Sequence, residues 1–171
     1  MVAATLQPMI ALGIDPGLAS TGWAVVERSG STLAVLGSGT LKTSPRTPHA
    51  ERLRSLFMGV ADVIATHDVV GAAVESWFIH PVSKAAMGMA EARGAILVAI
   101  ANAGVTVAEY PPTEIKLAVT GSGRADKDQV RAMVTRLTRH DAGTDHAADA
   151  IAAAICFLNR EPLRAAIRKA Q

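Results

Sequence analysis

A short apolar run near the start of the chain places the strongest constraint on its fold. The run covers residues 9–14 and passes directly into Asp15-Pro16-Gly17, a turn sequence. An apolar stretch of this length, closed by turn residues, is typical of a buried strand. Because a buried strand needs cover on its faces, we expect a sheet that is flanked by helices.

The segments that follow predict a mixed sheet. Residues 22–27 and 33–43 follow at hairpin-like distances and are expected to be strands, with a loop at 44–49. Residues 69–75 and 105–109 are predicted as the fourth and fifth strands. A meander pairs antiparallel, whereas strands separated by helices pair in parallel through right-handed crossovers. The predicted fold class is α/β, a five-stranded mixed sheet in a single domain over residues 1–171.

Helices are predicted between and after these strands. Apolar residues three and four apart indicate a helix packed on one face, namely Leu53, Leu56, Phe57, Val60 and Ile64. Thr47 is expected to cap this helix, with Pro48 at its first position. Further helices are expected at residues 83–103, with Ser83 as a possible cap, and at 113–119, 127–137 and 145–158. A Gly-rich loop at residues 121–123 and a short basic tail complete the chain.

Composition narrows the class of protein. Half of the 171 residues are apolar, and no apolar run is long enough for a membrane span. The single cysteine, Cys156, lies in an apolar run and is predicted to be a core residue. The first residues lack the basic segment of a signal peptide, so a cytoplasmic protein is expected.

Basic side chains are concentrated in the second part of the chain. Residues 1–110 carry 7 basic and 8 acidic side chains, whereas residues 111–171 carry 10 basic and 7 acidic. A positive bias in the second part fits a polyanionic partner, but on charge alone a solvated surface is the better interpretation.

Two carboxylates follow predicted strands. Asp15 ends the first strand and Glu75 ends the fourth, so parallel pairing would bring both to the carboxyl edge, where α/β sheets bind ligands. Asp15 is also a common turn residue ahead of Pro-Gly. Glu75 stands between apolar segments, and an acid in that setting needs a partner or a metal.

A third acidic segment lies on the last predicted helix. His146 and Asp149 are three residues apart and Asp145 and Asp149 four, so either pair shares one face. Asp145 is expected to cap the helix, His146 is either solvated or functional, and a functional role is favoured for Asp149. Oxygen-rich clusters suit divalent cations, and two ions ~4 Å apart can cleave phosphodiesters. Lys116, Arg124 and Lys127 could contact phosphates, although lysines are most often ordinary surface residues.

The motifs together resemble the RuvC family of Holliday-junction resolvases. Gly13-Ile14-Asp15-Pro16-Gly17 is similar to its opening motif, and Val74-Glu75-Ser76-Trp77-Phe78 to its second acidic motif. Ala92-Arg93-Gly94, the segment Gly121-Ser122-Gly123-Arg124-Ala125-Asp126-Lys127 and His146-Ala147-Ala148-Asp149-Ala150 match later motifs in the same order. The resemblance covers roughly residues 10–158.

The resemblance implies an RNase H-like fold and a homodimer that cuts four-way DNA junctions symmetrically with Mg²⁺ or Mn²⁺, alongside a RuvA- and RuvB-type branch-migration motor. It assigns metal binding and catalysis to Asp15, Glu75, His146 and Asp149, and DNA contacts to Lys116, Lys127, Arg124 and Phe78. Small and apolar residues on several faces of the helix at 83–103 also favour a dimer contact.

Two departures from the family leave alternatives open. Many members carry Asp at the position of His146, so either His146 or Asp145 completes the metal site. Many also carry a polar Asn after the aromatic residue, where this chain has Ile79-His80-Pro81-Val82.

Other classes of protein share parts of this pattern. Actin-like ATPases share the opening motif, but they need two such domains and have no use for the later acids. An RNA nuclease of the YqgF type and a non-catalytic junction-binding module are the alternative functions.

Overall fold

The computed structural model describes residues 7–76 and 83–169, and within the last helix it describes side chains up to Glu161. Its sheet contains β1 (Met9–Asp15), β2 (Ser20–Ser29), β3 (Thr32–Lys42), β4 (Gly71–Glu75) and β5 (Thr106–Tyr110), in the order β3-β2-β1-β4-β5. The pairs β1–β2 and β2–β3 are antiparallel, and β1–β4 and β4–β5 are parallel. The predicted mixed five-stranded sheet is therefore confirmed.

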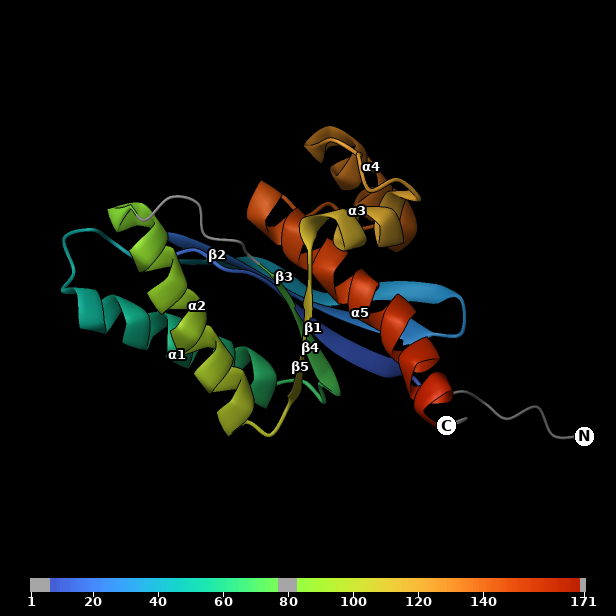
Figure 1. Cartoon of the computed structure of the whole chain (residues 1–171), viewed down its shortest axis with the longest axis horizontal. Coiled ribbons are helices and arrows are strands. Elements are labelled where there is room, and N and C mark those ends of the chain that lie inside the picture. The colour runs from blue at the N-terminus through green and yellow to red at the C-terminus, as the bar shows by residue number, and fades with distance from the viewer. Residues whose placement is uncertain (1–6, 77–82, 170–171) are drawn as a thin grey trace, which may run out of the picture.

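Helices cover both faces of this sheet. The first two, α1 (His49–Ala65) and α2 (Lys84–Asn102), lie on one side in Figure 1, and α3 (Pro112–Thr120), α4 (Lys127–Thr138) and α5 (Asp145–Lys169) lie on the other. Successive side chains of β1 point to opposite faces of the sheet, as in any pleated strand. Ala11 packs in the core beneath α5, whereas Leu12 and Ile14 pack in the core beneath α1 and α2. Among the described residues, no helix is long and apolar enough to cross a membrane.

Of the three predicted helix caps, one is confirmed and two are wrong. Ser83 does cap α2, because its hydroxyl accepts a hydrogen bond from Ala86 N at 3.1 Å. The prediction of Thr47 as a cap is wrong: Pro48, with ψ of 141°, holds that position and the helix begins at His49 without a side-chain cap. Asp145 is not the cap of α5 either, since Thr144 Oγ1 accepts from Ala147 N at 3.2 Å.

The ends of two elements also differ from the predictions. β4 begins at Gly71 rather than at residue 69. The helix predicted to stop at residue 158 continues to Lys169, so the basic tail is helical. That segment is rich in Arg and Ala, which favour helix, and it contains no glycine to end the helix.

Two glycines let α5 lie directly against the sheet. A Cβ atom on Gly13 of β1 would stand 1.9 Å from the backbone oxygen of Ala150, and one on Gly22 of β2 would stand 2.0 Å from that of His146. Real Cβ atoms do not approach backbone so closely, so a larger residue at either position would push the helix away. These glycines therefore set where the first turns of α5 lie.

Candidate active site

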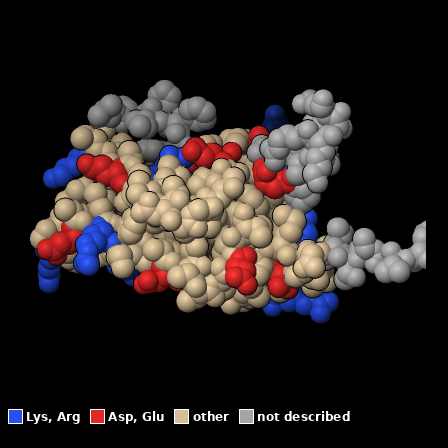
Figure 2. Space-filling model, turned by 90° about the horizontal axis from the view of Figure 1, so that it is seen from below, with Lys and Arg blue, Asp and Glu red and all other residues tan. Residues whose placement is uncertain are grey.

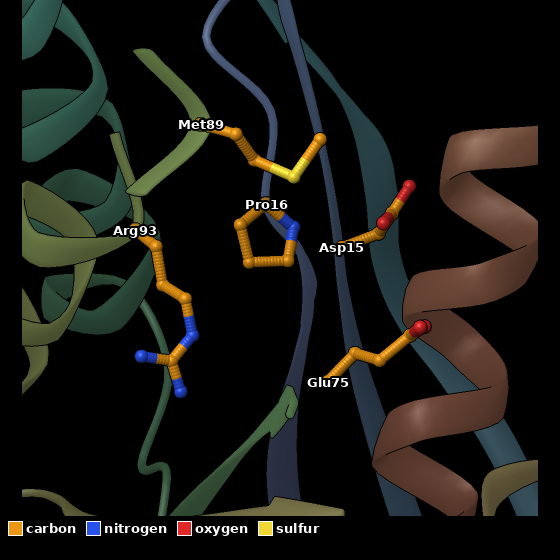
Figure 3. Close-up of a pocket in the computed structure, with 5 residues that line it drawn as sticks. All are labelled: Asp15, Pro16, Glu75, Met89 and Arg93. Atoms are coloured by element: carbon orange, nitrogen blue, oxygen red, sulfur yellow. The ribbon is translucent and has the colours of Figure 1, made fainter. Parts of the chain in front are cut away.

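Two carboxylates meet at the carboxyl edge of the sheet. β1 and β4 pair in parallel with Ile14 opposite Val74, so the next residues, Asp15 and Glu75, end neighbouring strands side by side. Since side chains alternate along a strand, Asp15 follows the direction of Ala11, toward α5. Figure 3 shows Asp15 and Glu75 both turned toward that helix. The predicted placement of these two acids at one edge is confirmed.

The first turns of α5 add two more polar side chains. His146 Nδ1 lies 2.6 Å from Asp15 Oδ2, and Asp149 lines the same cleft as Asp15 and Glu75. Asp145 points elsewhere, where its Oδ1 is 3.3 Å from Arg131 Nη1. The structure thus brings Asp15, Glu75, His146 and Asp149 together and leaves Asp145 outside the group.

The cleft holds an excess of partly buried negative charge. Burial raises the pKa of Glu75 from 4.5 to about 7, with Asp15 and Asp149 adding to the rise and Lys116 and Lys127 opposing it. The pKa of Asp149 is also raised, chiefly by burial and then by Asp15, against the pull of Lys127. Carboxyl groups that resist ionisation in this way are stabilised by a nearby cation.

The donor set fits a hard divalent cation. Three carboxylates and one imidazole from β1, β4 and α5 supply oxygen and nitrogen ligands to one cleft. Within residues 7–76 and 83–169, no three of the His, Cys, Asp and Glu side chains already converge closely enough to enclose an ion. His146 and Asp15 instead contact each other directly, and both would have to turn toward an ion to bind it.

Basic residues line one wall of the cleft. Lys116 of α3 and Lys127 of α4 both border it, and Lys127 Nζ lies 3.7 Å from Asp149 Oδ2. Lys127 is the first residue of α4, whose start is fixed by a capping box between Asp126 and Gln129. Arg124 is exposed in the loop before this helix and is not among the residues that line the cleft. Phe78 lies outside the described residues.

Arg93 is a cleft residue to which sequence reasoning assigned no role. Its side chain extends from α2 and lines the cleft on the side of Pro16 and Met89, as Figure 3 shows. Its Nη2 is 2.5 Å from Glu109 Oε2, and its Nε is buried without a hydrogen-bond partner among the described residues. The signal available in the sequence was the Ala92-Arg93-Gly94 motif, which was matched to the family without a role for its arginine.

Comparison with known proteins gives this cleft its context. The sequence profile of the family described as crossover junction endodeoxyribonuclease RuvC matches residues 11–157. A protein of that name from Parvibaculum lavamentivorans is 46% identical over 146 residues, which cover 85% of this chain and 83% of the relative.

Two solved structures agree with the sequence match. Thermus thermophilus RuvC has a TM-score of 0.83 and 33% identity over 91% of this chain and 97% of its own. The same protein in complex with a Holliday junction substrate has a TM-score of 0.80 and 30% identity, over 91% and 96% of the two chains. The RNase H-like fold predicted from the motifs agrees with this likeness. On the family match, the relatives and the shared fold, this chain belongs to the RuvC family of crossover junction endodeoxyribonucleases.

Proposed function

We propose that this chain is a cytoplasmic, structure-specific endonuclease that resolves four-way Holliday junctions by hydrolysing phosphodiester bonds with Mg²⁺ or Mn²⁺. The observation that carries the proposal is the partly buried carboxylate cluster beside two lysines at the edge of the sheet. It is supported by the family match and by a relative of the same fold in complex with a Holliday junction.

In this mechanism the acids and His146 of the cleft would serve as metal ligands. Asp15, Glu75 and Asp149 would hold divalent ions through their oxygens, and His146 would add a nitrogen ligand once it turns away from Asp15. When bound, such ions lower the pKa of a water and stabilise the leaving oxygen. The carboxylates also exclude a second anion from the cleft until a cation offsets their charge, which makes DNA binding and metal binding support one another.

The lysines complete the site by attracting the substrate. Lys116 and Lys127 stand beside the acids, where a phosphate next to the scissile bond can accept hydrogen bonds from both. Contacts of this kind set the position of the DNA strand but carry no base specificity. We therefore assign them to strand positioning and the acids to catalysis.

Paired cuts require two sites related by a two-fold axis, so we propose that the protein acts as a homodimer. From the resemblance to the RuvC family, we also propose that it works with a RuvA- and RuvB-type motor. We assign the dimer contact to α2, where Met87 and Val98 are 57% and 53% exposed.

The test is cleavage of a synthetic mobile four-way junction, with linear duplex and a matched RNA beside it, in Mg²⁺ or Mn²⁺. We expect paired nicks in the junction and none in the duplex. Asp15→Asn and Asp149→Asn should remove cleavage and keep junction binding, because each keeps the shape of the side chain but lowers its charge. Asp62→Asn, on the exposed surface of α1, is the control and should cut normally.

Other results would support the alternatives. Preferential cutting of RNA would favour an RNA nuclease, and junction binding without cutting in either metal would favour a non-catalytic module.

A further inference from the structure

A second groove adjoins the carboxylate cleft on the side of α1 and α2. Its walls are formed by Leu18, Arg52, Lys84, Ala85 and Gly88, and we name it the α1–α2 groove. It shares three lining residues with the carboxylate cleft, namely Gly17, Met89 and His146. The two depressions are therefore continuous, and a ligand that passes through the cleft can extend into the groove.

Arg52 is held in place by polar contacts that leave its charge unbalanced. Its Nε donates to Thr43 Oγ1 at 2.9 Å, and the Thr43 hydroxyl in turn donates to the backbone oxygen of Leu18. In the part of the chain that the structure describes, no carboxylate lies within 4.0 Å of the Arg52 guanidinium. The guanidinium is thus fixed at Nε, with its terminal nitrogens available to an anion.

Lys84 adds a second cation to the same wall. It is exposed at the first position of α2 and, among the described residues, forms no ion pair. A neighbouring depression also lined by Arg52 and Lys84 contains one acid, Glu91, whose Oε2 is 2.7 Å from His49 Nε2. The part of the groove next to the cleft therefore carries positive charge without a carboxylate in its lining.

Three arginines elsewhere in the described residues are paired with acids. Arg93 contacts Glu109, Arg131 contacts Asp141 and Asp145, and Arg160 contacts Glu114. The face seen in Figure 2 carries Lys, Arg, Asp and Glu scattered around a wide uncharged centre. Arg52 and Lys84 form no such pair among the described residues, and both line the groove that adjoins the carboxylate cleft.

The two pairs of cations stand on opposite sides of the acids. Lys116 and Lys127 come from α3 and α4, on the α5 side of the sheet, whereas Arg52 and Lys84 come from α1 and α2 on the other side (Figure 1). A phosphodiester backbone that crosses the sheet edge at the carboxylates therefore meets cations before and after them. Regularly spaced phosphates are bound by such flanking contacts.

We propose that the α1–α2 groove binds the DNA backbone on the side of the scissile phosphate opposite Lys116 and Lys127. This inference rests on the proposed function, because it takes the ligand of the cleft to be DNA. It adds to the acids and lysines of the family motifs a second phosphate-binding wall formed by Arg52 and Lys84.

The experiment measures junction binding against salt concentration in a Glu75→Gln background that does not cut. Arg52→Gln removes the charge but keeps a hydrogen-bond donor for Thr43. Lys84→Gln removes the charge at an exposed position. Each should weaken binding and lower the slope of log K against log [salt] by about one unit, and the double variant by about two. Arg54→Gln is the matched control, because Arg54 lies on α1, is exposed and does not line the groove. Unchanged slopes in Arg52→Gln and Lys84→Gln would overturn the proposal.

A second readout locates the contact. Ethylation of single phosphates in the junction should interfere with binding of the Glu75→Gln protein on both sides of the cleavage position. Interference should disappear on one side in Lys84→Gln and on the other in Lys127→Gln. If the Glu75→Gln protein does not bind the junction at all, the proposed function fails. If it binds but the interference pattern is the same in Lys84→Gln, only the groove assignment fails.

Discussion

Replacing Glu75 by Gln should stabilise the metal-free protein even though it removes cleavage. The Glu75 carboxyl is partly buried beside Asp15 and Asp149, and its pKa rises from 4.5 to about 7 on folding. A raised folded-state pKa means that ionised Glu75 destabilises the fold. The stability that protonated Glu75 provides is complete below pH 4.5 and is lost as the pH rises through about 7.

The magnitude follows from the two pKa values. Their difference, at about 1.4 kcal/mol per pH unit, gives an upper limit of about 3 kcal/mol at pH 8. Solvent reaches part of the side chain and screens its neighbours, so we expect about 1–2 kcal/mol. In a domain of this size each kcal/mol corresponds to about 2–4 °C in Tm. Glu75→Gln should therefore melt about 2–8 °C above the wild-type protein at pH 8.

The assay is thermal unfolding in EDTA at pH 5 and pH 8, followed by circular dichroism. The advantage of Glu75→Gln should be largest at pH 8 and shrink toward pH 5, because there the wild-type carboxyl is protonated in the folded state. Asp62→Asn, at an exposed site on α1, controls for loss of a carboxylate in general. If the Tm of Glu75→Gln does not exceed that of the wild-type protein at pH 8, or exceeds it equally at both pH values, then ionised Glu75 does not destabilise the fold.

Three further predictions test packing, ligand chemistry and helix capping. Gly13→Ala should lower the free energy of unfolding by more than about 2 kcal/mol and remove cleavage, because the new Cβ meets the Ala150 oxygen; an unchanged denaturation midpoint would contradict this close contact. His146→Asp should cut junctions and raise the rate in Mg²⁺ relative to Mn²⁺, measured side by side, since Mg²⁺ prefers oxygen ligands; an unchanged ratio would remove His146 from the ligand set. Asp126→Ala should lower the free energy of unfolding by about 1 kcal/mol through loss of the α4 capping box, and an unchanged denaturation midpoint would contradict that cap.

Much of the scaffold could be predicted because its signals are local. Apolar runs closed by turn residues located all five strands, and the separation of β1 from β4 by a helix predicted their parallel pairing. That pairing alone places Asp15 next to Glu75, so half of the candidate site follows from order along the chain. The spacing of His146 and Asp149 on one helix face supplied the rest of the candidate set.

The parts that sequence reasoning missed depend on contacts between distant segments. Nothing local distinguishes Thr144 from Asp145 as a cap, since both residue types are good caps. In the structure Thr144 caps α5, whereas Asp145 pairs with Arg131 of α4, a contact between separate elements. The pairing of Arg93 with Glu109 is likewise set by the packing of α2 beside β5, which no periodicity reveals.

Docking of α5 links the stability of the protein to its chemistry. Residues 150–158 of this helix are all buried, and they lie over the sheet that carries Asp15 and Glu75. Packing of that apolar segment offsets the repulsion that arises when Asp149 joins the two strand carboxylates. The acids cannot separate to relieve their repulsion without undoing core contacts, so the repulsion is relieved by protonation or by a bound cation. Glycines at the α5–sheet contact therefore matter to catalysis as much as to folding, although they touch no substrate.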